Sequence, residues 1–300
     1  MQAEPPVQKP LPAAILIAGP TASGKSALAM QLAAERGGVV INADSMQVYR
    51  ELSILTARPS PSDEAVATHR LYGHVPAAEA YSVGRYLREA EAEITIAIEA
   101  DRVPIVVGGT GLYFKALIEG LSPIPDIPAE VRAHWRAEAE RLGPAALHGE
   151  LTRRDAPIAE RLRPTDPQRM VRALEVLEAT GRSLAYWQAM PGRPVVDAER
   201  SETFVLAPPR AEIVTRADAR FEAMMVAGAL DEVAALVALG LDPVLPAMRA
   251  LGVAPLARHL AGEVSREAAV AEAKRETRAY VKRQLTWLHR HMVSWNWNNK

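Results

Sequence analysis

The feature that most constrains this chain is an octapeptide near its N-terminus, Gly19-Pro20-Thr21-Ala22-Ser23-Gly24-Lys25-Ser26. It lies between an apolar run, 13–18, and an amphipathic segment, 27–36, which is the strand–loop–helix setting of a phosphate-binding P-loop. Its glycines let the backbone curl around a ligand, so that N–H groups point at phosphate oxygens. Lys25 adds positive charge, and the Ser26 hydroxyl is placed to ligate a phosphate-bound Mg²⁺. The chain is therefore expected to bind a molecule that carries phosphates.

Length and composition set broad limits. The chain has 300 residues, 49% of them hydrophobic, which suggests about two domains. It contains no cysteine, which excludes disulfides and thiolate chemistry and is compatible with a reducing cytoplasm. Residues 1–12 contain four prolines and no apolar core, so we expect a flexible tail and no signal peptide. No apolar run approaches the roughly 18 residues of a membrane span. We expect a cytoplasmic protein without membrane contact.

Short apolar runs at 14–18, 39–43, 103–107 and 202–206 alternate with segments of helical period. Continuous apolar strands that alternate with helices are typical of a parallel sheet covered on both faces. The pattern predicts an α/β fold with a P-loop NTPase-like core flanked by helices. Ligands of such sheets gather at the carboxyl ends of the strands, where Asp44 and Thr110 are expected to lie beside the P-loop.

The pattern changes after residue 120. Residues 121–128 contain three prolines in six positions and are expected to form an extended connector. Residues 129–188 show no strand pattern and have breaks at 143–144, 156–157 and 163–164. We therefore predict an all-helical insertion domain over 124–195. The catalytic core would comprise 13–123 and 196–300, with helices at its C-terminal end.

Charge is unevenly distributed along the chain. The formal net charge is −1, yet residues 274–300 carry seven Lys or Arg and one Glu. A basic end on a nearly neutral protein indicates either a contact with a polyanion or a solvated helix face. Charge by itself does not separate these two interpretations.

The P-loop by itself suggests ATP and phosphoryl transfer, and Asp44 is the residue that tests this. It ends a buried strand, where a carboxylate can hold Mg²⁺ through water, act as a general base, or cap the next helix. A common P-loop hydrolase would need a further water-positioning residue, and a small-molecule kinase an Arg-rich lid. The residues alone leave these possibilities open.

Several longer motifs carry a resemblance. The P-loop together with Asp44-Ser45-Met46-Gln47-Val48-Tyr49 resembles the tRNA dimethylallyltransferase (tRNA isopentenyltransferase) family. The similarity spans roughly 13–290 and continues through 56–59, 108–113, 166–169, 248–252 and 282–288. It implies transfer of a dimethylallyl group from dimethylallyl diphosphate to N6 of the adenosine 3′-adjacent to the anticodon (position 37), which forms N6-isopentenyladenosine. It also implies a P-loop core with a helical insert.

The resemblance gives the P-loop a different task, because the diphosphate becomes a leaving group. Lys25, Ser26 and Mg²⁺ would neutralise its charge as the allylic C–O bond breaks. Asp44 matches the family's general base for the adenine amine. Thr21 and Arg216 match positions that touch the diphosphate or its bridging oxygen. Arg220, one helical turn later, is the reserve candidate for Arg216.

The resemblance also implies an RNA surface for an anticodon stem-loop whose target base is splayed out of its stack. We expect a monomer to be able to hold this hairpin. The residues expected to contact the tRNA are Asp44, Ser45, Met46, Gln47, Thr110, Arg132, Gln168, Arg169, Met170, Val171, Arg172, Arg249, Lys282, Arg283 and Gln284.

The chain departs from the family pattern at two places. Leu55 stands where the family usually has Gly, with Arg58 in place of Lys, and Val253-Ala254 stands where Tyr-Arg is common after Gly252. The second change removes an aromatic ring and a charge. Three alternatives remain: a prenyltransferase that acts on a free adenine nucleotide, a P-loop small-molecule kinase, and a non-catalytic RNA-binding protein.

Overall fold

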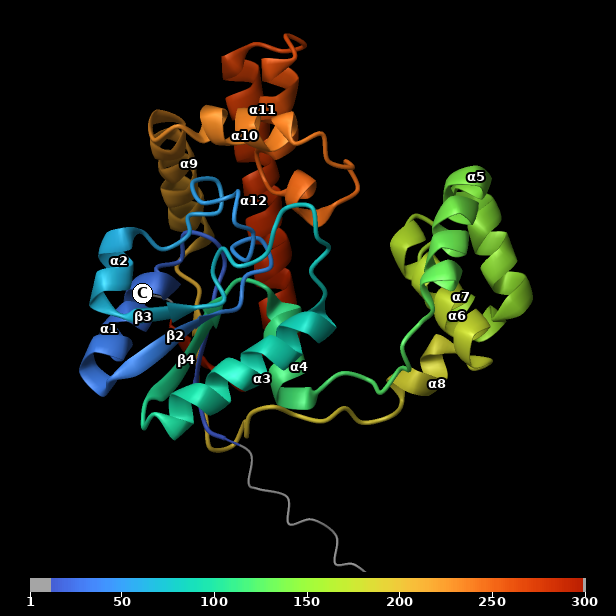
Figure 1. Cartoon of the computed structure of the whole chain (residues 1–300), viewed down its shortest axis with the longest axis horizontal. Helices are drawn as coiled ribbons and strands as arrows, with labels where there is room; N and C mark the ends of the chain where they lie inside the picture. The colour runs from blue at the N-terminus through green and yellow to red at the C-terminus, as the bar shows by residue number, and fades with distance from the viewer. Residues whose placement is uncertain (1–11, 299–300) are drawn as a thin grey trace, which may run out of the picture. The chain divides into compact units, whose positions relative to one another are not determined.

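A computed structural model describes residues 12–298, and its core is a six-stranded parallel sheet (Figure 1). The strand order is β3-β2-β4-β1-β5-β6. The strands are β1 (Ile15–Ala18), β2 (Gly38–Asn42), β3 (Thr68–Arg70), β4 (Val103–Gly108), β5 (Glu202–Leu206) and β6 (Asn296–Asn298). The four apolar runs form the central strands, as the sequence predicted. The edge strands β3 and β6 escaped prediction because three residues are too short to show a pattern.

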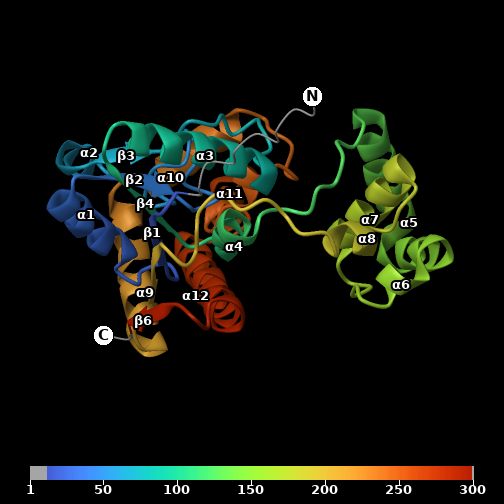
Figure 2. The same ribbon diagram turned by 90° about the horizontal axis from the view of Figure 1, so that it is seen from below.

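Helices cover both faces of the sheet, which explains why its strands read as unbroken apolar runs. One face packs against α1 (Lys25–Arg36) and the opposite face against α3 (Val83–Glu99), as seen in Figure 2. Successive strand residues alternate between the two: Ile15 and Ile17 face α1, whereas Leu16 belongs to the other cluster. The sheet is therefore buried on both sides and presents its strand ends to ligands.

The C-terminal part adds a layer of helices at the strand ends. α9 (Arg210–Val226) runs beside α12 (Arg266–His291), as both views show. Ser265 caps α12, because its hydroxyl accepts a hydrogen bond from the Ala268 N–H at 3.2 Å. The described residues 12–118 and 194–298 form one compact unit, the α/β unit. Its other helices are α2 (Pro61–Val66), α4 (Gly111–Glu119), α10 (Ala229–Ala238), α11 (Val253–Leu260) and the 3₁₀ helix η1 (Pro246–Arg249).

Residues 119–193 form a second compact unit with its own core. The structure describes all of them and assigns no strand among them. The helices are α5 (Ala129–Arg154), α6 (Ala156–Ala159), α7 (Pro167–Thr180) and α8 (Leu184–Gln188). α5 kinks at Gly143, where φ is 71° just before Pro144. The sequence placed the insert at 124–195; contacts within the chain bound it at 119 and 193.

The predicted flexible tail, 1–12, lies outside the described residues except for Pro12. Within 12–298, no helix has both the length and the apolar character that a membrane span requires.

Candidate active site

The P-loop closes around the N-terminus of α1. Gly24 adopts a left-handed conformation (φ 92°) immediately before the helix begins at Lys25. Gly19 also has to be glycine, since a Cβ there would lie 2.7 Å from the carbonyl oxygen of Leu206. This geometry leaves the first N–H groups of α1 without partners inside the helix, and such groups form a ready site for anions.

Lys25 is the cation of this loop. Its Nζ donates to the carbonyl oxygen of Pro20 at 3.2 Å, which holds the side chain folded over the loop. Burial lowers the pKa of Lys25 to about 8, and the negative charge of Asp44 opposes this shift. An anion with several negative charges would favour the protonated amine, so ligand binding and Lys25 protonation are coupled.

Asp44 is positioned by hydrogen bonds within its own turn. Its N–H donates to Asn42 Oδ1 at 2.8 Å, and its Oδ1 accepts from the Met46 N–H at 2.9 Å. Asn42 is itself held by the Leu71 carbonyl at 3.0 Å. The backbone after β2 also approaches the end of β4 closely. A Cβ on Gly108 would lie only 2.0 Å from the Ala43 carbonyl oxygen, so this approach requires glycine. The carboxylate is thereby oriented before any ligand binds.

Gln284 joins the P-loop to the end of β4. Its Oε1 accepts from the Thr21 N–H at 3.0 Å, and its Nε2 donates to the Gly109 carbonyl at 2.9 Å. The side chain is buried. The sequence predicted an RNA contact for Gln284, whereas the structure gives it a bracing role between two loops.

Arg220 is the arginine that reaches the P-loop. Its Nη2 donates a hydrogen bond to Thr21 Oγ1. Burial lowers the pKa of Arg220, and the negative charge of Asp44 opposes this shift. Arg216, one helical turn earlier, is instead exposed and pairs with Glu212. The structure therefore corrects the sequence-based preference: Phe221 and Ala217 face the core, and this orientation of α9 brings position 220, not 216, toward Thr21.

Some of these groups line one cavity of about 250 Å³. Thr21, Asp44 and Arg220 form its polar side. Apolar side chains form much of the remaining wall, namely Met46, Leu55, Phe221, Met224, Ala250 and Leu251. Polar atoms at one side and hydrocarbon at the other suit a small ligand that has both characters.

Basic and aromatic residues of η1 and α12 also line the cavity. Arg249 and Arg283 are exposed, and the Arg283 guanidinium carbon lies 5.5 Å from the Tyr280 ring centroid. Burial raises the pKa of Tyr280, and so does the negative charge of Asp44. Sequence analysis did not single out Tyr280, although its position three residues before Arg283 on a predicted helix was a usable signal.

The remaining predicted contacts of the α/β unit have defined partners. Thr110 Oγ1 accepts from the Ser45 N–H at 3.0 Å, which places both residues beside Asp44. Gln47 donates to the Thr56 and Ala57 carbonyls at 2.9 and 3.0 Å, so its side chain supports a loop. Lys282 is exposed on α12.

In the helical unit the predicted RNA residues divide by exposure. Arg132, Gln168 and Arg169 are exposed. Met170 is fully buried in the core of the unit, which corrects its predicted RNA contact, and half-buried Val171 packs against the same core. Arg172 lies 3.3 Å from the Glu175 carboxylate.

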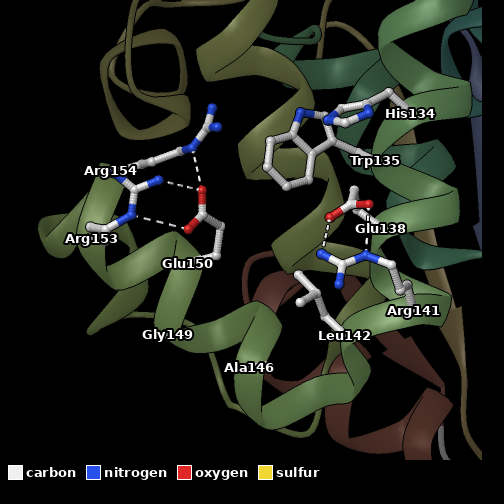
Figure 3. Close-up of a pocket in the computed structure, with 10 residues that line it drawn as sticks. All are labelled: His134, Trp135, Glu138, Arg141, Leu142, Ala146, Gly149, Glu150, Arg153 and Arg154. Carbon is white, nitrogen blue, oxygen red and sulfur yellow. Dashed lines mark hydrogen bonds and ion pairs between the residues drawn. The ribbon is translucent and has the colours of Figure 1, made fainter.

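A second cavity, of about 510 Å³, lies within the helical unit between the two arms of kinked α5 (Figure 3). Its arginines pair with neighbours on the same helix: Arg153 with Glu150 at 2.7 Å and Arg141 with Glu138 at 2.7 Å. Exposed pairs of this kind contribute little to stability. All the residues that line this cavity lie on α5.

The described residues contain no group of three or more His, Asp or Glu side chains that could hold a metal ion by themselves. A P-loop site does not need one, because phosphate oxygens and water complete the coordination around a single hydroxyl. Ser26 is exposed at the start of α1, and the buried Ser23 hydroxyl has no hydrogen-bond partner within residues 12–298. The residues therefore fit a Mg²⁺ that arrives with a diphosphate.

Comparison with known proteins gives a consistent result. A family model described as IPP transferase matches residues 47–291, and one described as isopentenyl transferase matches residues 12–75. The chain belongs to the IPP transferase family. IPP transferase relatives include tRNA dimethylallyltransferases from Bradyrhizobium sp. (strain ORS 278), 53% identical over 95% of this chain and 92% of the relative, and from Methylobacterium nodulans, 57% identical over 95% and 93%.

Solved structures of the same family share the fold. The full-length tRNA isopentenylpyrophosphate transferase from Bacillus halodurans is 31% identical with a TM-score of 0.69, and covers 96% of this chain and 89% of its own. A eukaryotic dimethylallyltransferase described as acting on tRNA is 27% identical with a TM-score of 0.79, and covers 92% and 70%. The IPP transferase core of this chain is thus a P-loop NTPase-like sheet with flanking helices.

Proposed function

We propose that the chain transfers a dimethylallyl group from dimethylallyl diphosphate to N6 of the adenosine 3′-adjacent to the anticodon of tRNA. One observation carries the proposal: a single cavity joins the P-loop, a preoriented carboxylate and an apolar wall. The apolar wall suits a hydrocarbon group attached to the diphosphate. Relatives over 50% identical along nearly the whole chain are named tRNA dimethylallyltransferases.

The reaction exchanges one bond for another. The C1–O bond of the allylic diphosphate breaks, and its electron pair leaves with the diphosphate while N6 of adenine forms a bond to C1. Charge grows on the bridging oxygen, where the Arg220 guanidinium and the Thr21 hydroxyl lie together. Lys25 and the N–H groups of α1 hold the terminal phosphate oxygens. Asp44 hydrogen-bonds the amine and accepts the proton that N6 loses.

Arg220, and not Arg216 as the sequence predicted, would contact the diphosphate at its bridging oxygen. Gln284 acts as a positioning residue, because it fixes the Thr21 N–H and the Gly109 carbonyl in one frame. Ser26 would hold Mg²⁺ together with the diphosphate, and the ion would supply further positive charge to the leaving group.

Binding of the anticodon stem-loop uses both units. Arg249 and Arg283 line the cavity that contains Asp44, where a splayed base and its flanking phosphates would enter. Lys282 on the same unit and Arg132, Gln168 and Arg169 on the helical unit are exposed and accessible to phosphates, and Arg169 would exchange its pairing with Asp166 for one with a phosphate. We propose a monomer that acts in the cytoplasm, where mature tRNA is found.

The test is incubation of the purified chain with Mg²⁺, dimethylallyl diphosphate and unmodified tRNA, followed by digestion and mass analysis of nucleosides. We expect N6-isopentenyladenosine from tRNA and from an isolated anticodon stem-loop RNA, and none from free AMP. Prenylated AMP in place of prenylated tRNA would favour the nucleotide-prenylating alternative. Transfer of the γ-phosphate of ATP to a small acceptor would favour a kinase.

A further inference from the structure

Glu232, on the first turn of α10, binds a loop of the α/β unit through its carboxylate. Oε2 accepts hydrogen bonds from the Ser53 N–H at 2.7 Å, the Ser53 hydroxyl at 2.9 Å and the Ile54 N–H at 2.7 Å. Oε1 accepts from the Leu55 N–H at 2.9 Å. Three consecutive amides thus converge on one anion, as in an anion-binding nest. Such charge-assisted hydrogen bonds are stronger than neutral ones and fix the position of the loop.

The loop is also held from its other end. Gln47 donates to the Thr56 and Ala57 carbonyls at 2.9 and 3.0 Å. Gln47 lies in the segment that begins with Asp44, so these hydrogen bonds fix the position of the loop relative to the general base. Glu232 accepts hydrogen bonds from the N–H groups of the loop, and Gln47 donates hydrogen bonds to its carbonyl oxygens.

Leu55 is the side chain that this arrangement presents to the active-site cavity. It is buried and lines the cavity together with Phe221. A Cβ built on Gly252 would lie 3.3 Å from Leu55 Cδ2 and 3.1 Å from Phe221 Cε2, so the three residues pack against one another. This packing supports Leu55 and Phe221 where they form part of the apolar wall of the cavity. The volume of about 250 Å³ is below the range of roughly 300–1,000 Å³ that is common for sites of drug-sized ligands.

We propose that Leu55 is the wall that limits the length of the prenyl chain, and that Glu232 is the positioning residue that keeps this wall in place. The inference rests on the proposed function, because it requires the apolar side of the cavity to receive the allylic chain. The chemistry of a longer donor is the same: C1–O breaks, N6–C1 forms, and the diphosphate departs. Only the space beyond C1 differs between dimethylallyl and geranyl diphosphate.

The experiment compares kcat/KM for the two donors with the full chain and unmodified tRNA. Leu55→Ala is expected to raise the geranyl-to-dimethylallyl ratio by about 10-fold or more, the scale on which apolar pockets discriminate methylene groups. Glu232→Gln keeps the size of the side chain but loses the charge that gathers the amides. It is expected to raise the same ratio by about 3-fold or more, because a freed loop lets Leu55 withdraw.

Two further variants make the test specific. Asp231→Asn removes the same charge from the exposed neighbouring position and is expected to leave the ratio unchanged. Glu232→Asp keeps the charge and is expected to lie closer to the wild type than Glu232→Gln. A loss of stability alone would lower the use of both donors together and leave their ratio constant.

An unchanged ratio in Leu55→Ala, with dimethylallyl transfer still measurable, would refute the proposal that Leu55 limits the length of the prenyl chain. An unchanged ratio in folded Glu232→Gln, or equal ratios in the Gln and Asp variants, would overturn the role of Glu232. If Glu232→Gln does not fold, Glu232→Asp against Asp231→Asn decides that role by the same ratio. A wild-type chain that prenylates no tRNA would refute the proposed function instead, which is a distinguishable failure.

Discussion

The two units of this chain use charge in opposite ways. In the α/β unit, Arg220 and Asp44 line one cavity and their charges act on nearby Lys25, and burial lowers the pKa values of both cations. In the helical unit, arginines such as Arg153 and Arg141 pair with acids three residues away on an exposed helix. Interactions between charges that are shielded from water are strong, whereas interactions between exposed charges are screened by salt and the side chains can rearrange. The first arrangement suits bond making, and the second suits contact with an RNA backbone.

The largest expected effect comes from Asp44. Asp44→Ala should lower kcat for tRNA prenylation by about 10³-fold, within the range for loss of a general base. The Kd for tRNA should change little, since a carboxylate contributes no attraction to phosphates. Single-turnover rates and filter binding on one preparation separate the two quantities. A variant with near-normal kcat would break the assignment of chemistry to the α/β unit.

Arg220 comes next, with Arg216 as its matched control. Arg220→Ala should lower kcat by about 10²-fold, because it removes a preorganised donor from the leaving oxygen. Arg216→Ala removes the same charge from an exposed position of the same helix and should change kcat by less than about 2-fold. Equal effects of the two substitutions, measured with saturating substrates, would contradict the placement of Arg220 at Thr21.

The depressed pKa of Lys25 predicts a pH dependence. Its amine loses its charge near pH 8 in the free protein, so KM for dimethylallyl diphosphate should rise as pH increases through about 8. Lys25→Met should raise KM at pH 7 and flatten that dependence. The effect on stability has the opposite sense. The unfolded chain, with its ordinary pKa of 10.5, binds more protons between pH 8 and 10.5, so this residue makes folding more favourable as pH rises there.

The smallest effects are expected in the helical unit. Arg169→Ala should weaken tRNA binding a few-fold, leave kcat unchanged, and reduce the slope of log K against log salt by about 0.7–0.9 for one lost phosphate contact. Arg153→Ala is the control, since Arg153 is similarly exposed and pairs at 2.7 Å with Glu150, whereas Arg169 lies 3.3 Å from the Asp166 carboxylate. If Arg169→Ala lowers kcat at saturating tRNA, the division of labour between the units is wrong.

Much of the core could be predicted because local rules decide it. Each central strand is long enough to show a buried run, and Gly24-Lys25-Ser26 has a helix start that its own residues require. The edge strand β6 could not be predicted, because Asn296–Asn298 has no apolar pattern and pairs only through its position beside β5. The same holds for Gln284, whose partners Thr21 and Gly109 lie far away in sequence.

The choice between Arg216 and Arg220 shows the limit of periodicity. Both lie on one face of α9 by spacing, but a helix of 3.6 residues per turn rotates position 220 by about 40° from position 216. That rotation, with the tilt of the helix on its core residues, decides which guanidinium reaches Thr21. Met170 is a similar case, since Gln168 and Arg169 just before it are exposed while its own side chain packs inward.

By itself the sequence determined a phosphate site, a parallel sheet, a helical insert and the family, because each depends on neighbours within a short stretch or on a linear motif. The tertiary structure alone decided which arginine reaches Thr21, how Gln284 braces the P-loop, and how Glu232 holds the loop that carries Leu55. Those contacts join residues 175 or more positions apart. Such pairs are created by the way elements pack, and packing leaves no trace in a local pattern.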